Sequence, residues 1–177
     1  MILAPGFEEI EAITPIDALK RAGIEITIAG LNDIEVKSAR EVIIKADCLL
    51  DDVSDDFDAV ILPGGGDGAK NLAASEKVKE LVLKQNEQAK IIAAICASPA
   101  VVLHPLGILS MKRMTCFPGC EENLDPDVFY MMDSVVVDDH LITSDGPAHA
   151  LEFSLMIIKA LLGDEMYQKI GKATLYL

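Results

Sequence analysis

Short apolar runs alternate with amphipathic stretches along most of the chain. The runs are rich in Ile, Val, Leu and Ala, as buried strands are. The stretches between them repeat apolar residues every three or four positions, as helices do. The pattern predicts strands at Met1–Ala4, Ile24–Ala29, Ala59–Leu62, Ile91–Ile95, Val135–Asp138 and Leu141–Ser144. It predicts helices at Glu8–Ala22, Lys70–Gln88, Ala97–Leu103, Gly146–Leu162 and Met166–Ile170.

Glycine, serine and proline mark the boundaries of these elements. Gly23 and Gly163 follow two of the predicted helices, and Ser75 is a suitable N-cap for a second helix within 70–88. Glu35–Lys45 is expected to form a small antiparallel excursion, and Arg113–Phe129 is the least regular part. With no internal repeat or linker in view, we expect residues 1–177 to form a single domain.

Strands that alternate with helices predict an α/β fold, with a mostly parallel sheet covered by helices on both faces. Ligands of such folds bind at the carboxyl ends of the strands. The loops expected there are rich in glycine, proline and other small residues, which permit a close approach to the backbone. These loops are Ala4–Glu8, Pro63–Gly68, Cys96–Pro99 and Ser144–Pro147.

Composition narrows the possible partners. The 177 residues are 51% apolar with a mean hydropathy of +0.33, yet no apolar run approaches the roughly 20 residues that span a bilayer. A net charge of −14 argues against nucleic acid and against anionic membrane surfaces. The first residues show no signal-peptide pattern, so a cytoplasmic protein is predicted. The cysteines and histidines lack the spacing of a zinc site, so no metal is expected.

Cys96 lies where an apolar strand is expected to turn sharply into a helix. Ala94 and Ser98, two residues on either side, are small enough for such an elbow, and Pro99 suits the first turn of a helix. Exposed at the elbow and aimed at a helix N-terminus, the sulfur should favour the thiolate. The alternative is an inert buried cysteine.

Two neighbouring segments offer partners for this cysteine. Gly64 and Gly65 belong to a glycine loop without a nucleotide-binding motif, so its N–H groups are interpreted as an oxyanion site, unless the loop is a plain turn. Glu8, Glu9 and Glu11 either complement the helix dipole or place one protonated carboxyl beside the sulfur. The residues alone do not choose among the three.

Other candidates carry weaker signals. His149, at the start of the last long helix, is an auxiliary partner for Cys96 or simply a packed or solvated histidine. Gly146 and Pro147 lie in a loop at the same sheet edge and are expected to line the site. Cys116 and Cys120 are a disulfide, a resolving pair or inert thiols.

Taken together, these residues resemble the DJ-one/ThiJ/PfpI superfamily, and its DJ-one branch in particular. The resemblance runs almost from end to end. The segments that carry it are Leu3–Glu11, Arg21–Ile24, Leu62–Gly65 with Gly68-Ala69, Ala93–Ala97 with Pro99, and Thr143-Ser144 with Gly146-Pro147.

The resemblance implies a flavodoxin-like α/β sandwich that forms a homodimer and needs no cofactor. It implies that Cys96 is a reactive, oxidisable nucleophile and that the protonated glutamate is Glu11. It also implies that the N–H groups of Gly65 and Ala97 form the oxyanion site.

The chain departs from the family pattern at several positions. Ala97 replaces the histidine that follows the cysteine in the PfpI proteases, which disfavours a peptidase. Phe117 replaces a histidine found in many DJ-one members, and Ser98 replaces the usual Gly or Ala. The first strand also begins several residues later than the family pattern.

The sequence therefore predicts cofactor-free glyoxalase or deglycase chemistry on 2-oxoaldehydes such as methylglyoxal, or on their adducts. The alternative is a redox sensor or chaperone in which Cys96 is oxidised without turnover. A glutamine amidotransferase ranks last, because His149 and Glu152 are one residue too far apart for its His-x-Glu pair.

Overall fold

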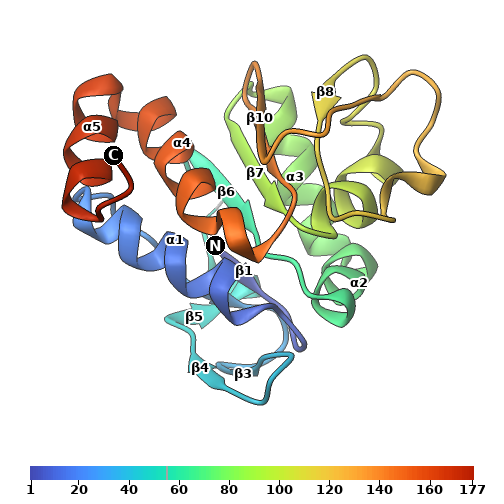
Figure 1. Cartoon of the computed structure of the whole chain (residues 1–177). Helices are drawn as coiled ribbons and strands as arrows, with labels where there is room; N and C mark the ends of the chain where they lie inside the picture. The colour runs from blue at the N-terminus through green and yellow to red at the C-terminus, as the bar shows by residue number, and fades with distance from the viewer. Residues whose placement is uncertain (55) are drawn as a thin grey trace.

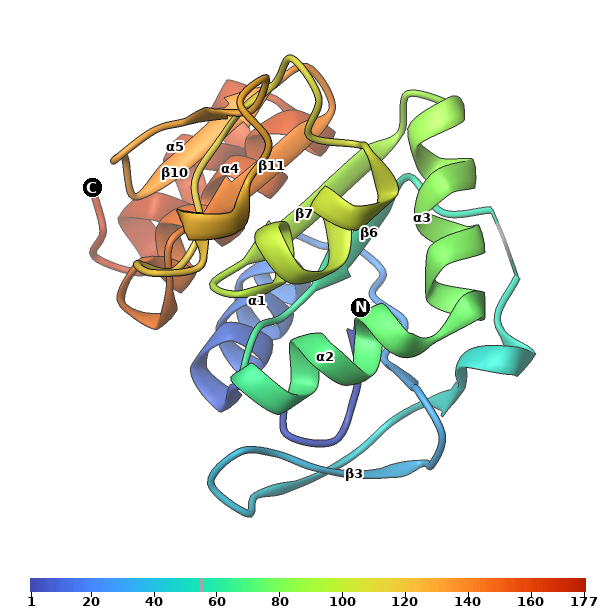
Figure 2. The same ribbon diagram turned by 90° about the vertical axis from the view of Figure 1, so that its right-hand side faces the viewer.

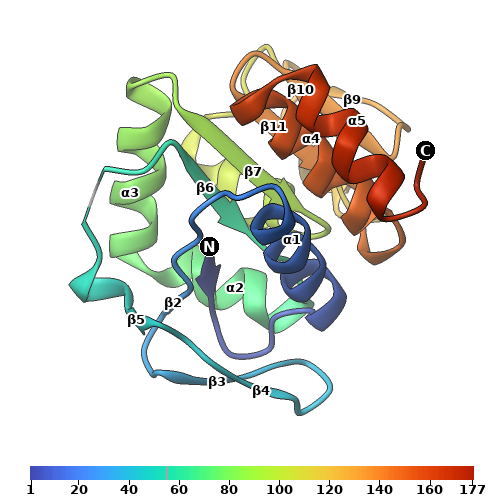
Figure 3. The ribbon, with the colours of Figure 1, turned by 90° about the vertical axis from the view of Figure 1, so that its left-hand side faces the viewer.

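A computed structural model describes residues 1–54 and 56–177 and contains a central sheet between two layers of helices (Figure 1). Three parallel strands, β6 (Ala59–Leu62), β7 (Ile91–Ile95) and β11 (Leu141–Ser144), form its middle, and β10 (Val135–Asp138) adds an antiparallel edge. A second parallel set lies beside β6 (Figure 3). It consists of β1 (Ile2–Leu3), β2 (Ala29–Gly30) and β5 (Cys48–Leu49).

Helices cover both faces of the sheet. One face carries α1 (Glu9–Arg21), α4 (Ala150–Leu162) and α5 (Asp164–Ala173). The other carries α2 (Gly66–Ala74), α3 (Glu76–Glu87) and the segment 99–106 (Figure 2). This arrangement confirms the predicted flavodoxin-like α/β fold.

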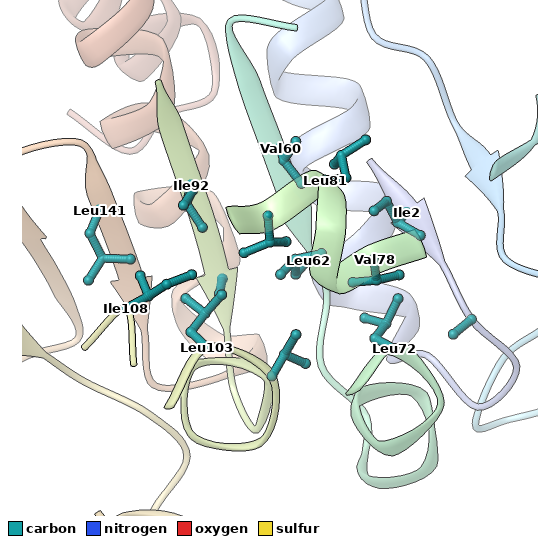
Figure 4. Packing of buried hydrophobic residues seen from close by; sticks show 14 of the residues in the cluster. Ile2, Val60, Leu62, Leu72, Val78, Leu81, Ile92, Leu103, Ile108 and Leu141 are labelled. Carbon is teal, nitrogen blue, oxygen red and sulfur yellow. The ribbon is translucent and has the colours of Figure 1, made fainter. Parts of the chain in front are cut away.

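The alternation of side chains along each strand builds two cores. Ile61, Ala93, Ile95 and Ile142 pack with α1 and α4 residues on one face. Val60, Leu62, Ile92 and Ala94 point to the opposite face, as successive strand residues must. Figure 4 shows this second core, where Leu72, Val78 and Leu81 of α2 and α3 meet the sheet.

Two small ladders lie outside the main sheet. The predicted excursion at 35–45 is an antiparallel hairpin of β3 (Glu35–Lys37) and β4 (Ile43–Lys45). The least regular region contains the short parallel pair β8 (Arg113–Met114) and β9 (Phe129–Tyr130). None of the helices in the described residues is long and apolar enough to cross a membrane.

Two predicted elements differ from the structure, and one predicted helix boundary is confirmed. The strand expected at Ile24–Ala29 is regular only at Ala29–Gly30, because the two residues of β1, Ile2 and Leu3, pair with these two residues. The second helix predicted within 70–88 is confirmed, because α2 and α3 meet at Ser75, whose Oγ accepts a hydrogen bond from Val78 N at 3.3 Å. The helix expected at Ala97–Leu103 is a short π-helical turn, Pro99–Leu103.

Candidate functional site

The elbow at Cys96 is the most strained point of the site. Its φ of +66° lies in the left-handed region, which is costly for a residue with a side chain. Cys96 N donates to Ser144 O of β11 at 2.8 Å, and Phe117 N donates to Cys96 O at 2.8 Å. The surrounding structure therefore holds the elbow from two sides, and the predicted sharp turn after β7 is confirmed.

Glu11 reaches Cys96 from a different layer of the fold. It belongs to the first turn of α1, yet its side chain is fully buried, whereas Glu9 is directed to the hairpin at Ser38 and Arg40. Glu11 Oε2 accepts a hydrogen bond from Gly64 N at 2.8 Å. Its Oε1 is buried with no hydrogen-bond partner of normal geometry among the described residues.

The Glu11 carboxyl and the Cys96 thiol shift each other's protonation. Burial raises the pKa of Glu11 to about 7, against the opposing effects of Cys96 and Gly64 N. Burial and the Glu11 carboxylate raise the pKa of Cys96 to about 12, while the N–H groups of Gly65 and Ala97 lower it. The predicted bias toward thiolate is therefore wrong while Glu11 is ionised, because burial and a neighbouring carboxylate outweigh two N–H groups and a short π-turn. Protonation of Glu11 removes the carboxylate's share of this shift.

The glycine loop fits closely against both residues. A Cβ on Gly64 would lie 2.5 Å from Cys96 Cβ and 2.6 Å from Glu11 Oε2. Gly65 has a φ of +93°, and a Cβ there would lie 2.3 Å from Gly6 O. Only glycine therefore allows the two N–H groups to approach the carboxyl and the sulfur this closely.

The buried carboxyl predicts a pH-dependent stability. Unfolding returns Glu11 to its ordinary pKa of 4.5, so between pH 4.5 and about 7 the folded protein holds a proton that the unfolded chain releases. The proton bound to Glu11 stabilises the folded protein fully below pH 4.5. As the pH rises to about 7 this stabilisation is lost, and the free energy of unfolding falls by about 3 kcal/mol. The glutamine of Glu11→Gln does not ionise, so this variant does not lose stability in this way.

We therefore expect Glu11→Gln to be more stable than the wild type at pH 8, by about 3 kcal/mol, and equal to it near pH 4.5. Urea unfolding at the two pH values measures the difference. Glu80→Gln, at an exposed position of α3, is the control for the general effect of removing one negative charge. An equal gain in both variants would show that burial of Glu11 is not the cause.

The remaining predicted residues lie at the same edge of the sheet. Gly146 follows β11 and packs against the ring of Phe117, whose Cδ2 would lie 3.4 Å from a Cβ at Gly146. Pro147 begins the turn that leads into α4. His149 Nδ1 hydrogen-bonds to Asp145 Oδ1 at 2.6 Å, and no hydrogen bond described for His149 joins it to Cys96.

The other cysteines are free thiols in the structure. Burial raises the pKa of Cys116 to about 12 and also raises the pKa of Cys120. Within the described part of the chain, no three His, Cys, Asp or Glu residues gather as a metal site. A cavity of about 840 Å³ lies at the opposite end of the sheet, lined by Met1, Ile24, Ala59 and Ile91 among others, and is separate from this chemistry.

Sequence reasoning missed one contact of this site. The sequence indicates only that Ser98 is small, whereas in the structure its Oγ donates to Pro63 O, beside the glycine loop. The sequence shows a serine two residues after the elbow cysteine, but it does not show that the hydroxyl of this serine donates to Pro63 O.

Residues 1–160 match the model of the DJ-1/PfpI family. Among curated proteins, the chain is 45% identical over 178 residues to protein dj-1beta of Drosophila melanogaster, covering 99% of this chain and 95% of that protein. It is 43% identical over 175 residues to protein DJ-1 homolog B of Arabidopsis thaliana, and there it spans 98% of its own length but only 40% of the relative's. It is 39% identical over 176 residues to a Caenorhabditis elegans protein named glutathione-independent glyoxalase DJR-1.2, covering 97% of this chain and 93% of that one.

Solved structures of DJ-1 proteins are also similar to this chain. The crystal structure of Drosophila melanogaster DJ-1beta superposes with a TM-score of 0.94 at 45% identity, covering 98% of this chain and 95% of that one. A structure of Toxoplasma gondii DJ-1, described as oxidized, superposes with a TM-score of 0.94 at 36% identity and the same coverage.

Proposed function

The chain belongs to the DJ-1/PfpI family, and we propose that it converts 2-oxoaldehydes such as methylglyoxal to 2-hydroxy acids without glutathione or another cofactor. The observation that carries the proposal is the position of the buried Glu11 carboxyl, bonded to Gly64 N at 2.8 Å, beside the Cys96 thiol. The relative named as a glutathione-independent glyoxalase supports the same reaction class.

In the proposed reaction, the sulfur of Cys96 adds to the aldehyde carbon of methylglyoxal and a C–S bond forms. The aldehyde oxygen becomes the hydroxyl of a hemithioacetal, with its developing charge held by the N–H groups of Gly65 and Ala97. Glu11 then transfers the proton from the former aldehyde carbon to the neighbouring ketone carbon, while the proton of the hemithioacetal hydroxyl passes to the ketone oxygen, and the product is a lactoyl thioester. Water cleaves the C–S bond, releases lactate and restores the thiol.

Glu11 suits this role because its raised pKa of about 7 lets one carboxyl both give and accept a proton near neutral pH. An early adduct of an oxoaldehyde with an amine would enter the same sequence, which is the proposed deglycase activity. Gly64, Gly146 and Pro147 are proposed to line the substrate site, and His149, paired with Asp145, is proposed as an auxiliary group at its rim.

The test is lactate formation from methylglyoxal by the purified protein, followed by proton NMR without added glutathione or metal. We expect many lactate molecules per protein. Less than one lactate per protein would overturn the proposed turnover.

Oxidation of Cys96 is the second candidate function. The N–H groups of Gly65 and Ala97, which lower the pKa of the thiol, would also stabilise a negatively charged oxidised sulfur. Two molecules of peroxide would convert the thiol to a sulfinate, each giving one oxygen atom and releasing water. The structure of the Toxoplasma relative described as oxidized supports oxidation of Cys96 as a function. A gain of two oxygen atoms on Cys96, without lactate formation, would favour a redox sensor or chaperone over an enzyme.

We also propose that the protein is a cytoplasmic homodimer. Ile10 and Ile13 of α1 and Val42 and Ile43 at β4 are exposed apolar side chains. Glu9 ties the two elements together, because its Oε1 accepts from Arg40 N at 2.7 Å. An apolar surface shared by two joined elements is typical of an interface between copies.

Ile13→Glu is therefore expected to convert a dimer into a monomer, because a buried carboxylate in the interface would be unpaired. Size-exclusion chromatography with light scattering measures the mass, against 19.0 kDa for one chain. Met132→Glu, at a side chain that is 94% exposed outside this surface, should leave the mass unchanged. A wild type that is monomeric at micromolar concentration would contradict the proposed interface.

A further inference from the structure

Ser98 forms a buried bridge between two loops that are far apart in the sequence. Its side chain is fully buried, and its Oγ donates to Pro63 O at 2.6 Å. Ser98 lies in the elbow two residues after Cys96, whereas Pro63 directly follows β6 and precedes the glycine loop. One hydroxyl thus joins the loop that carries the sulfur to the loop that carries its N–H partners.

The bridge closes a ring of contacts around the site. From Pro63 the chain passes to Gly64, whose N–H donates to Glu11 Oε2 at 2.8 Å and whose carbonyl accepts from Glu8 N at 3.0 Å. Glu11 in turn interacts with the Cys96 thiol, which shares the elbow with Ser98. A displacement of the glycine loop relative to the elbow would therefore move Glu11 and the Gly65 N–H away from the sulfur together.

The two backbone hydrogen bonds of Cys96 go to other segments, while its side chain packs against the glycine loop at Gly64. Cys96 N is bonded to Ser144 O in β11, and Cys96 O is bonded to Phe117 N. Both hold the elbow on the side of the sheet away from β6. The hydroxyl of Ser98 adds the hydrogen bond that joins the elbow to Pro63, the residue before the glycine loop.

We propose that Ser98 is a positioning residue that sets the distance between the Cys96 sulfur and the pair formed by Gly65 N–H and the Glu11 carboxyl. Its influence on turnover rests on the proposed function, but its influence on the thiol does not. Small errors in the placement of reacting groups reduce rates strongly, and about 1 Å can cost about 100-fold. A side chain without a hydroxyl leaves Pro63 O without this donor and releases the loop.

The test uses Ser98→Ala, with Ser154→Ala as the matched control. Ser154 is also fully buried and donates to a backbone carbonyl, Ala150 O, at 2.5 Å, but within α4. The two variants therefore lose the same kind of hydrogen bond. The main readout is the rate of Cys96 alkylation by iodoacetamide between pH 6 and 9, quantified on the Cys96 peptide by mass spectrometry.

We expect Ser98→Ala to change the Cys96 alkylation rate at least about fivefold and to shift its pH dependence, because the groups that set the thiol pKa have moved. Ser154→Ala should match the wild type within twofold at every pH. If the wild type forms lactate, Ser98→Ala should lower kcat about tenfold with little change in KM, as expected when alignment and not binding is lost.

Alkylation of Ser98→Ala at the wild-type rate and with the wild-type pH dependence would overturn the inference, whatever its effect on melting temperature. Ser98→Gly provides a second variant without the hydroxyl should the alanine variant not fold, and the same outcomes apply. Alkylation needs only the thiol, so absence of lactate in the wild type would refute the proposed function while leaving this test intact.

Discussion

Replacing Cys96 by serine is expected to lower lactate formation from methylglyoxal at least about 1,000-fold, the largest effect of any substitution in this protein. The side chains are similar in size, so the elbow should keep its shape. The hydroxyl, however, is a much weaker nucleophile than a thiol, because it ionises far less readily. Proton NMR of the product over hours resolves a loss of this size.

Cys48→Ser is the matched control for this substitution. Cys48 is a free, half-buried thiol in β5, at the far edge of the second parallel set of strands. It should retain the wild-type rate within twofold. Lactate formation by Cys96→Ser at more than a tenth of the wild-type rate would show that the Cys96 sulfur does not form the essential bond.

Glu11→Gln is expected to lower the same rate at least about 100-fold, within the usual contribution of a positioned general acid or base. The glutamine amide can still accept from Gly64 N in place of Oε2, but it has no proton to exchange with the substrate carbons. The loss should lie in kcat, because the proton transfer occurs after the sulfur has bound the aldehyde. Initial rates over a range of methylglyoxal concentrations separate kcat from KM.

A matched change at Glu9 keeps this prediction specific. Glu9 lies two residues away on α1, but its carboxylate bonds to the hairpin at Ser38 and Arg40 instead of the site. Glu9→Gln should therefore leave kcat within about twofold. Equal losses in the two variants would mean that negative charge at the start of α1, and not proton transfer by Glu11, is what the reaction needs.

The sequence was sufficient to predict the elements that carry a strong local pattern. The apolar run that stops at Cys96, flanked by small residues, indicated both β7 and the elbow, and the structure confirms both. The motif resemblance also selected Glu11 among three neighbouring acids, and Glu11 is the one that is fully buried. Local periodicity alone could not identify the buried acid, because all three acids lie within one turn of the helix start.

Features that depend on long-range contacts could not be predicted. The regular part of the strand expected at Ile24–Ala29 is short because its partner β1 offers only two residues for pairing, and the local pattern of Ile24–Ala29 contains no information about its partner. The thiolate expected at Cys96 is wrong while Glu11 is ionised, because burial and the Glu11 carboxylate raise the pKa of the thiol, and both depend on segments far from Cys96 in the sequence. The partner of His149 is Asp145, four residues before it, and that pairing required the turn at Gly146 and Pro147 to be seen.

The pH dependence of Cys96 alkylation in the wild type and in Glu11→Gln measures whether the two side chains control each other's protonation. At pH 5.5 Glu11 is protonated, so the two proteins should react at similar rates. At pH 8.5 the wild-type carboxylate raises the pKa of the thiol, so Glu11→Gln should react at least about tenfold faster although it makes less lactate. Equal alkylation rates across the whole range, or a faster wild type at pH 8.5, would show that the Glu11 carboxylate does not raise the pKa of the Cys96 thiol.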